Sequence, residues 1–159
     1  MKLQLKFNNQ SSNPSCAIKI NNIELYRGTV KNEYEFFIES ANGPCELLIE
    51  HWGKLPEDTI VENGVIVKDK SFELEKVVID DYDIEELIWE SEFVSSDGAV
   101  YPSCLFFGPT GSYVLKFYTP VVRWMLETRH NKNNNDPHWE EDYNYWTEAC
   151  KVLTQISNK

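Results

Sequence analysis

The 159-residue sequence lacks the signals that mark several large classes of protein. Its four cysteines, Cys16, Cys45, Cys104 and Cys150, are far apart and form no C-x-x-C pair, so neither a zinc knuckle nor a redox motif is supported. We expect reduced thiols, with a disulfide between Cys16 and Cys45 as the alternative. No apolar run approaches membrane-spanning length, and the alternating start at residues 1–7 lacks the apolar core of a secretory signal.

Basic residues are also scarce. The chain has 15 Lys and Arg against 26 Asp and Glu, which gives a formal net charge of −11. Nucleic-acid binding depends on cations that replace counterions around phosphates, so this composition argues against a nucleic-acid partner. The aromatic content of 13% exceeds what one core requires, and it favours contact surfaces for sugars or protein partners.

The residues that carry nucleophilic catalysis are few. His51, His130 and His138 are the only histidines, and neither Cys104 nor any serine lies in a recognisable nucleophile signature. The many carboxylates offer pairs for glycoside hydrolysis, but a pair acts only when the fold holds it across a cleft. We therefore predict that the protein is not an enzyme.

Short alternating runs fill residues 2–118 and predict strands. Two hairpins are indicated, one by Asn21-Asn22 and one by Glu62-Asn63-Gly64. Further strands are expected at residues 34–38, 45–52, 72–79, 84–89, 101–107 and 113–118. Turn signals at such regular intervals predict a mainly β protein, an antiparallel β-sandwich or jelly roll with a C-terminal helical appendage.

The domain organisation follows from where the helical spacing begins. We expect a β-sandwich domain over residues 1–120 and a helical C-terminal extension over residues 121–159, with an Asn-rich joint at 131–135. Residues 121–130 carry apolar side chains at helical spacing and predict a short helix. A strand that runs directly into Trp124 is the alternative for the same segment.

A second helix is predicted from Asp136, which can cap it, to residue 156. Its apolar stripe follows spacings of four and three, and something must cover that stripe. The helix can pack on its own sandwich, or it can swing on the polar joint to a neighbouring chain. We predict the intermolecular contact, with the partner-binding residues Trp139, Tyr143, Trp146 and Leu153.

Two further groups are candidate sites. Asp80, Asp81, Asp83 and Glu85 are hard oxygen ligands that could hold calcium, but they lack the glycine turn and spacing of an EF-hand. A solvated acidic turn is the simpler interpretation, so no cofactor is expected and calcium is the alternative.

His51 and Trp52 stand where a predicted strand runs into a loop. An exposed Trp beside polar groups is typical of a platform that stacks on a sugar ring. The alternative, which the sequence favours, is a Trp in the sandwich core with its N–H satisfied at the sheet edge.

Two segments carry a resemblance to known families. Residues 42–51 hold a glycine turn and a strand that leads into the His/Trp-Gly loop, and residues 70–81 hold a return strand that ends on an aspartate. Over residues 15–120 the chain resembles small β-sandwich modules in virion proteins of tailed bacteriophages and, more distantly, calcium-dependent carbohydrate-binding modules. Its short loops and helical tail depart from the carbohydrate-binding pattern.

The resemblance implies a non-enzymatic structural protein of a tailed-phage virion, in the head, neck, baseplate or fibre. Its partners would be other virion proteins or copies of itself, without nucleic acid or membrane. It would be located in the virion after synthesis in the host cytoplasm. The alternative function is a carbohydrate-binding module that recognises a cell-surface or capsular glycan.

Overall fold

The computed structural model describes residues 1–9, 13–39 and 42–132, and within them the chain is mainly β. The strands are β1 (Lys2–Asn8), β2 (Ser15–Ile20), β3 (Ile23–Thr29), β4 (Glu33–Phe37), β5 (Gly43–Trp52), β6 (Ile60–Glu62), β7 (Val65–Lys68), β8 (Phe72–Ile79), β9 (Tyr82–Asp83), β10 (Glu92–Ser95), β11 (Val100–Pro102), β12 (Phe106–Phe107) and β13 (Gly111–Thr119). The helices are the short 3-10 helices η1 (Pro56–Asp58) and η2 (Glu85–Glu90) and the α-helix α1 (Val121–Lys132).

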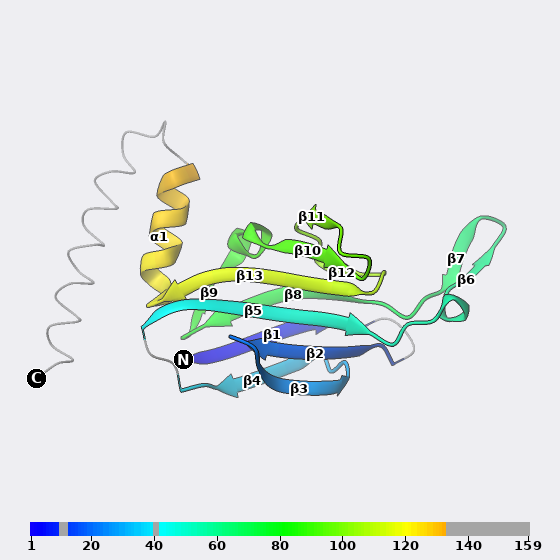
Figure 1. The fold of residues 1–159 in the computed structure, drawn as a ribbon, viewed down its shortest axis with the longest axis horizontal. Helices are drawn as coiled ribbons and strands as arrows, with labels where there is room; N and C mark the ends of the chain where they lie inside the picture. Colours follow the sequence, from blue (N-terminus) through cyan, green and yellow to red (C-terminus); the bar gives the residue numbers. More distant parts are fainter. Residues whose placement is uncertain (10–12, 40–41, 133–159) are drawn as a thin grey trace, which may run out of the picture.

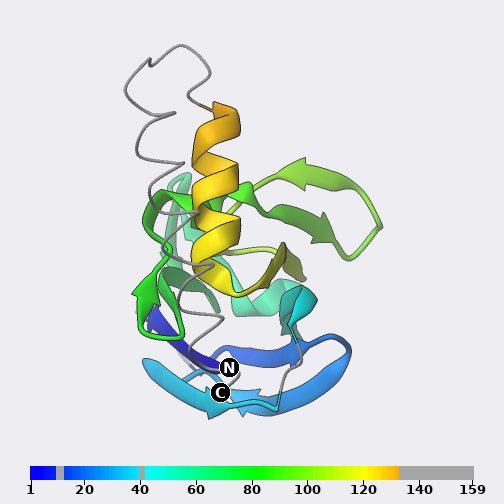
Figure 2. The ribbon, with the colours of Figure 1, turned by 90° about the vertical axis from the view of Figure 1, so that its left-hand side faces the viewer.

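The strands form two large antiparallel sheets and one separate hairpin (Figures 1 and 2). Sheet A has the order β12-β8-β1-β4, with β9 paired to the end of β8. Sheet B has the order β11-β10-β13-β5-β2-β3, and β6 pairs with β7. This arrangement confirms the predicted antiparallel β-sandwich with a helical C-terminal appendage.

Side-chain alternation along the strands builds the core between the sheets. Every second residue of β1, β5 and β13 is buried, as the period of two along a strand requires. Phe72 lies in the middle of this core, with its ring centroid 4.5 Å from that of Phe107 and 5.2 Å from that of His51. Both sheets therefore share one aromatic centre.

Both predicted hairpins are confirmed. Asn21 and Asn22 connect β2 to β3 with positive φ values of 49° and 66°, and Asn63 and Gly64 connect β6 to β7 with values of 51° and 78°. Asparagine and glycine tolerate this left-handed conformation, which two-residue hairpin turns need.

Two expectations about strands are wrong. The segment 84–89 is not a strand, and its residues from Glu85 onward belong to η2, because Ile84, Leu87 and Ile88 face the core at the spacing of one helical turn. The segment 101–107 is two strands in different sheets, because the chain crosses from β11 in sheet B to β12 in sheet A.

Cys16 and Cys45 are free thiols. The register of β2 against β5 places Cys16 opposite His51, so the two cysteines stand near opposite ends of the paired strands and cannot form the alternative disulfide. Burial raises the pKa of the Cys16 thiol to about 11.

The helix predicted at 121–130 is confirmed as α1, and the strand alternative is wrong. Val121, Trp124 and Met125 are buried, and the Trp124 ring lies 5.9 Å from that of Phe117 on β13, so α1 packs on the sandwich. It extends to Lys132 and takes in the first two residues of the predicted joint. The boundary at residue 120 stays a prediction. None of the helices in the described ranges is long and apolar enough to cross a bilayer.

Candidate functional site

The partner-binding residues predicted on the second helix, Trp139, Tyr143, Trp146 and Leu153, lie outside the described residues. Their role therefore stays a prediction. The other candidates lie on the sandwich, where their surroundings can be compared with the predicted roles.

The acidic residues predicted as an alternative calcium site are bound to cations and backbone groups. Asp80 accepts a hydrogen bond of 2.7 Å from the Lys2 backbone N–H, and the Asp81 carboxylate lies 3.0 Å from the Lys2 ammonium. Asp83 pairs with Lys76 at 2.8 Å, and Glu85 pairs with Arg129 on α1 at 3.0 Å.

Lys2 holds both Asp80 and Asp81, whereas Lys76 holds Asp83 and Arg129 holds Glu85. Within the described ranges, no three His, Cys, Asp or Glu side chains are arranged to hold a metal ion. The segment links β8, β9 and η2 to their neighbours, and its geometry favours the interpretation as a structural acidic turn.

His51 and Trp52 do not form one sugar platform, because consecutive strand residues point to opposite faces. His51 is 1% exposed, and its Nδ1 lies 3.0 Å from the Pro109 carbonyl oxygen. Burial lowers its pKa, against the smaller raising effect of that hydrogen bond. Trp52 is 36% exposed, with the Arg27 guanidinium 5.4 Å from its ring centroid. The favoured interpretation of Trp52 as a core residue is therefore wrong.

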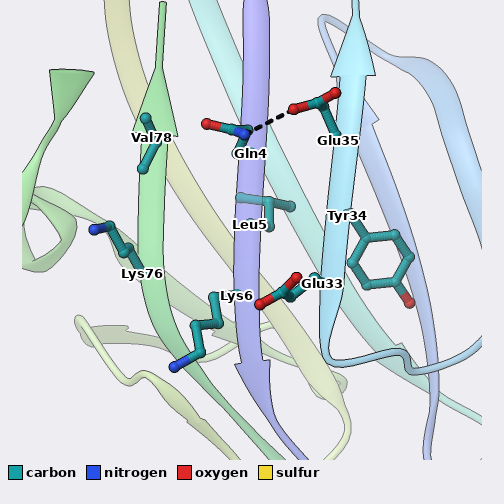
Figure 3. A pocket seen from close by; sticks show the side chains of 8 residues that line it. All are labelled: Gln4, Leu5, Lys6, Glu33, Tyr34, Glu35, Lys76 and Val78. Atoms are coloured by element: carbon teal, nitrogen blue, oxygen red, sulfur yellow. Dashed lines mark hydrogen bonds between the residues drawn. The ribbon is translucent and has the colours of Figure 1, made fainter. Parts of the chain in front are cut away.

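A polar hollow lies on the outer face of sheet A, away from the core (Figure 3). Its volume is about 550 Å³, within the range of small-molecule sites. It is lined by residues of the three adjacent strands β4, β1 and β8: Gln4, Leu5, Lys6, Glu33, Tyr34, Glu35, Lys76 and Val78.

The pairing of the strands sets which polar groups meet in this hollow. Gln4 lies opposite Glu35 on one side and Val78 on the other. Two residues further along β1, on the same face, Lys6 lies opposite Glu33 of β4 and Lys76 of β8. Alternate residues of each strand share a face of the sheet. The residues that point inward are therefore apolar and belong to the core, and those that point outward form the polar surface of the hollow.

Hydrogen bonds and ion pairs, within the hollow and with residues beside it, hold several of its polar groups in place. The Gln4 side-chain amide donates a 2.7 Å hydrogen bond to Glu35 (Figure 3). The Glu35 carboxylate also lies 3.4 Å from the Lys2 ammonium. Lys6 pairs with Glu75 at 2.9 Å, and the hydrogen bond from this pair raises the pKa of Lys6. The hollow therefore offers fixed donors and acceptors, and the described residues that line it include no nucleophile paired with a histidine.

Phe37 adds an aromatic ring to the same face. It follows Glu33 and Glu35 at intervals of two along β4, so all three point outward, and it lies opposite Lys2 of β1. Phe37 is 77% exposed, the highest value among the large apolar side chains in the described ranges. Among the described residues, this ring takes no part in the hydrophobic core.

None of these residues was predicted as a site from the sequence. The alternation in 33–37 does indicate that Glu33, Glu35 and Phe37 share a face, and this signal could have been used. The hollow also depends on β1 lying between β4 and β8, and no short motif encodes that pairing.

Comparison with known proteins adds little. No known protein family matches the chain, and no curated protein matches it. Among solved structures, the fold is similar to vCBM60 in complex with galactobiose, with 9% sequence identity and a TM-score of 0.49 over 72% of this chain and 97% of that one. At this identity and score, the similarity assigns neither a ligand nor a site to the chain.

Proposed function

We propose that the protein is a glycan-binding β-sandwich module whose site is the hollow on the outer face of sheet A. The observation that carries the proposal is the presence, on one face, of a polar hollow and the exposed ring of Phe37. Saccharides need hydrogen-bond donors and acceptors for their hydroxyl groups, and the apolar face of a pyranose covers an aromatic ring.

The polar groups suit hydroxyl recognition. Gln4 can both donate and accept, Glu33 and Glu35 accept, and the ammonium groups of Lys6 and Lys76 donate. Because Gln4 and Glu35 already bind each other, little side-chain freedom would be lost when a sugar binds.

The mixture of charges favours a neutral glycan. Lys6 and Lys76 line the same hollow as Glu33 and Glu35. Its electrostatic potential is therefore not positive throughout, as the binding of an acidic polymer would require. An oligosaccharide rich in hydroxyls matches such a surface better than a sulfated or phosphorylated chain.

The test is glycan binding by the full chain. A panel of neutral and acidic oligosaccharides is screened first, and the best ligand is then titrated calorimetrically. We expect a neutral ligand, and we expect Phe37→Ala and Gln4→Ala each to weaken binding about tenfold, the equivalent of about 1.4 kcal/mol.

Two exposed aromatics serve as matched controls. Tyr101→Ala, on β11 of sheet B, should leave the affinity unchanged, and so should Trp52→Ala. Binding that is lost in Trp52→Ala and kept in Phe37→Ala would reject the hollow and favour the alternative from the sequence, in which Trp52 stacks on the sugar. A chain that binds no member of the panel would overturn the proposed function.

A second candidate function is a structural role in an assembly, as predicted from the likeness to virion proteins. The observation that favours it is the exposed apolar hairpin β6–β7, which the sandwich does not cover. The location in a virion and the contact through the C-terminal helix are proposals of the same kind. Detection of the chain by mass spectrometry in purified particles would test them.

A further inference from the structure

The hairpin β6–β7 projects from the end of the molecule opposite α1 (Figure 1). Its two strands pair only with each other within the described ranges, so both outer edges keep unpaired backbone groups. Its large aliphatic side chains are between 41% and 63% exposed: Ile60, Val61, Val65, Ile66 and Val67. An isolated hairpin with open edges and exposed β-branched residues is a template for pairing with another strand.

Polar contacts fix the base of this hairpin to the body. The Lys54 ammonium lies 2.5 Å from the Asp69 carboxylate and donates a 2.5 Å hydrogen bond to the Gly108 carbonyl oxygen. The Thr59 hydroxyl donates a 2.7 Å hydrogen bond to Asp69. The side chains of Lys54 and Asp69 are only 13% and 14% exposed. The hairpin is therefore presented to a partner already ordered, which lowers the entropy cost of association.

We propose that β7 pairs antiparallel with β7 of a second copy of the chain, about a two-fold axis at Ile66. The run Val65-Ile66-Val67 has the same apolar pattern in both directions around that centre. In this register, Ile66 lies opposite Ile66 of the second copy, and each Val65 lies opposite a Val67. The two hairpins then form one four-stranded sheet, in which β-branched pairs stabilise the join.

The charges at the two ends of the hairpin also match a second copy. In the same register, Lys68 of each chain lies opposite Gly64 of the other chain, in the turn that follows Glu62 at the end of β6. Within the described ranges neither Glu62 nor Lys68 forms a salt bridge. Segment 54–70 holds three lysines and four carboxylates, so it is almost neutral in a chain of net charge −11. Two acidic copies can approach here with little repulsion.

The area buried by the β7–β7 contact indicates the class of complex to expect. A join of two short strands buries less than about 1,200 Å², the class of weak or transient complexes. We therefore expect a monomer at low concentration and a dimer that accumulates as the concentration rises.

The test is sedimentation velocity of the full chain over a concentration series, with circular dichroism to verify folding. The wild type should shift from the 18.6 kDa monomer toward twice that mass, and Ile66→Lys should stay monomeric because it places two like charges on the axis. Val100→Lys is the matched control, since Val100 is 61% exposed and Ile66 is 60% exposed. It should associate as the wild type does.

A cysteine at the axis gives an independent measurement if Ile66→Lys does not fold. Under mild oxidation, Ile66→Cys should form a covalent dimer that Val100→Cys and the wild type do not form, because opposed strand residues lie at disulfide distance. A wild type that is monomeric throughout, or an association that Ile66→Lys leaves intact, would overturn the proposal. In the second case the contact would belong to another surface, such as the predicted C-terminal helix.

Discussion

His51 is a buried titratable side chain in contact with the aromatic centre of the core. Its ring packs edge-on against Phe72, and its Nε2 has no hydrogen-bond partner among the described residues. Burial lowers its pKa, and the charges of Lys54 and Asp69 act on it in opposite directions. The folded protein therefore keeps this histidine neutral at a pH where the unfolded chain already binds a proton.

Stability should consequently fall as the pH decreases below the ordinary histidine pKa of about 6.5, because the unfolded state takes up the proton first. In His51→Phe this part of the pH dependence should be absent. The measurement is the urea midpoint at about pH 7.5 and about pH 5.5. The comparison variant Phe72→Leu should lose stability at both values and keep the pH dependence of the wild type. An unchanged pH dependence in His51→Phe would refute this role.

At the scale of elements, the contacts of Asp69 decide how firmly the hairpin β6–β7 is attached. Burial alone would raise the pKa of Asp69, but the hydrogen bonds from Lys54 and Thr59 outweigh it, and the pKa lies below its usual value. The stabilisation is thus complete at neutral pH. It is lost as the pH falls from the ordinary aspartate range through the lower pKa of the folded state.

We expect Asp69→Asn to lower the free energy of unfolding by about 1–3 kcal/mol at neutral pH, because the Lys54 ammonium loses its carboxylate partner in a largely buried position. The difference from the wild type should disappear in strong acid, where Asp69 is protonated. Denaturant unfolding at several pH values measures both effects. Glu57→Gln, on the exposed η1 segment, is the control and should match the wild type at every pH. An equal loss in that control would assign the effect to overall charge.

The elements differ in how far the sequence could predict them. The turns Asn21-Asn22 and Asn63-Gly64 carry their own conformational preference, so both hairpins were predicted correctly. The expectation of a strand at residues 84–89 is wrong, because Ile84, Leu87 and Ile88 have the spacing of a helical turn.

The candidate site was missed for a different reason. Gln4 and Glu35 are 31 residues apart, and Gln4 and Val78 are farther apart still, so the hollow exists only after β1 enters sheet A between β4 and β8. Local patterns show which residues face outward, but they do not show which strands are neighbours. The exposure of Ile66 was likewise hidden, because the sequence of β7 resembles a buried strand.

In the whole molecule, the proposed glycan site and the proposed dimer contact lie on different strands. The hollow belongs to β1, β4 and β8, and the dimer contact belongs to β7, so one surface does not block the other. Two copies joined through β7 would carry two glycan sites at a fixed separation, and a surface with many glycans would hold them more strongly than a soluble sugar does.

The stronger binding of a dimer to a glycan surface rests on both the proposed glycan site and the proposed β7 contact, and it can be measured separately. On a densely glycosylated sensor surface, the wild type should dissociate roughly tenfold or more slowly than Ile66→Lys. The affinity of both proteins for the free oligosaccharide should be the same. Equal dissociation rates on the surface, together with a confirmed dimer, would mean that the two sites cannot bind the surface at once.

The positions of β1 and β13 in their sheets have a consequence for the growing chain on the ribosome. β1 lies inside sheet A and reaches its neighbour β8 only after residue 79, and β13 lies inside sheet B between β10 and β5. Until residue 119 has been added, β5 lacks the strand that forms its longest pairing. At about 5–20 residues per second, the nascent polypeptide therefore spends several seconds with the interior of both sheets open, and the sandwich closes only after β13 has been synthesised.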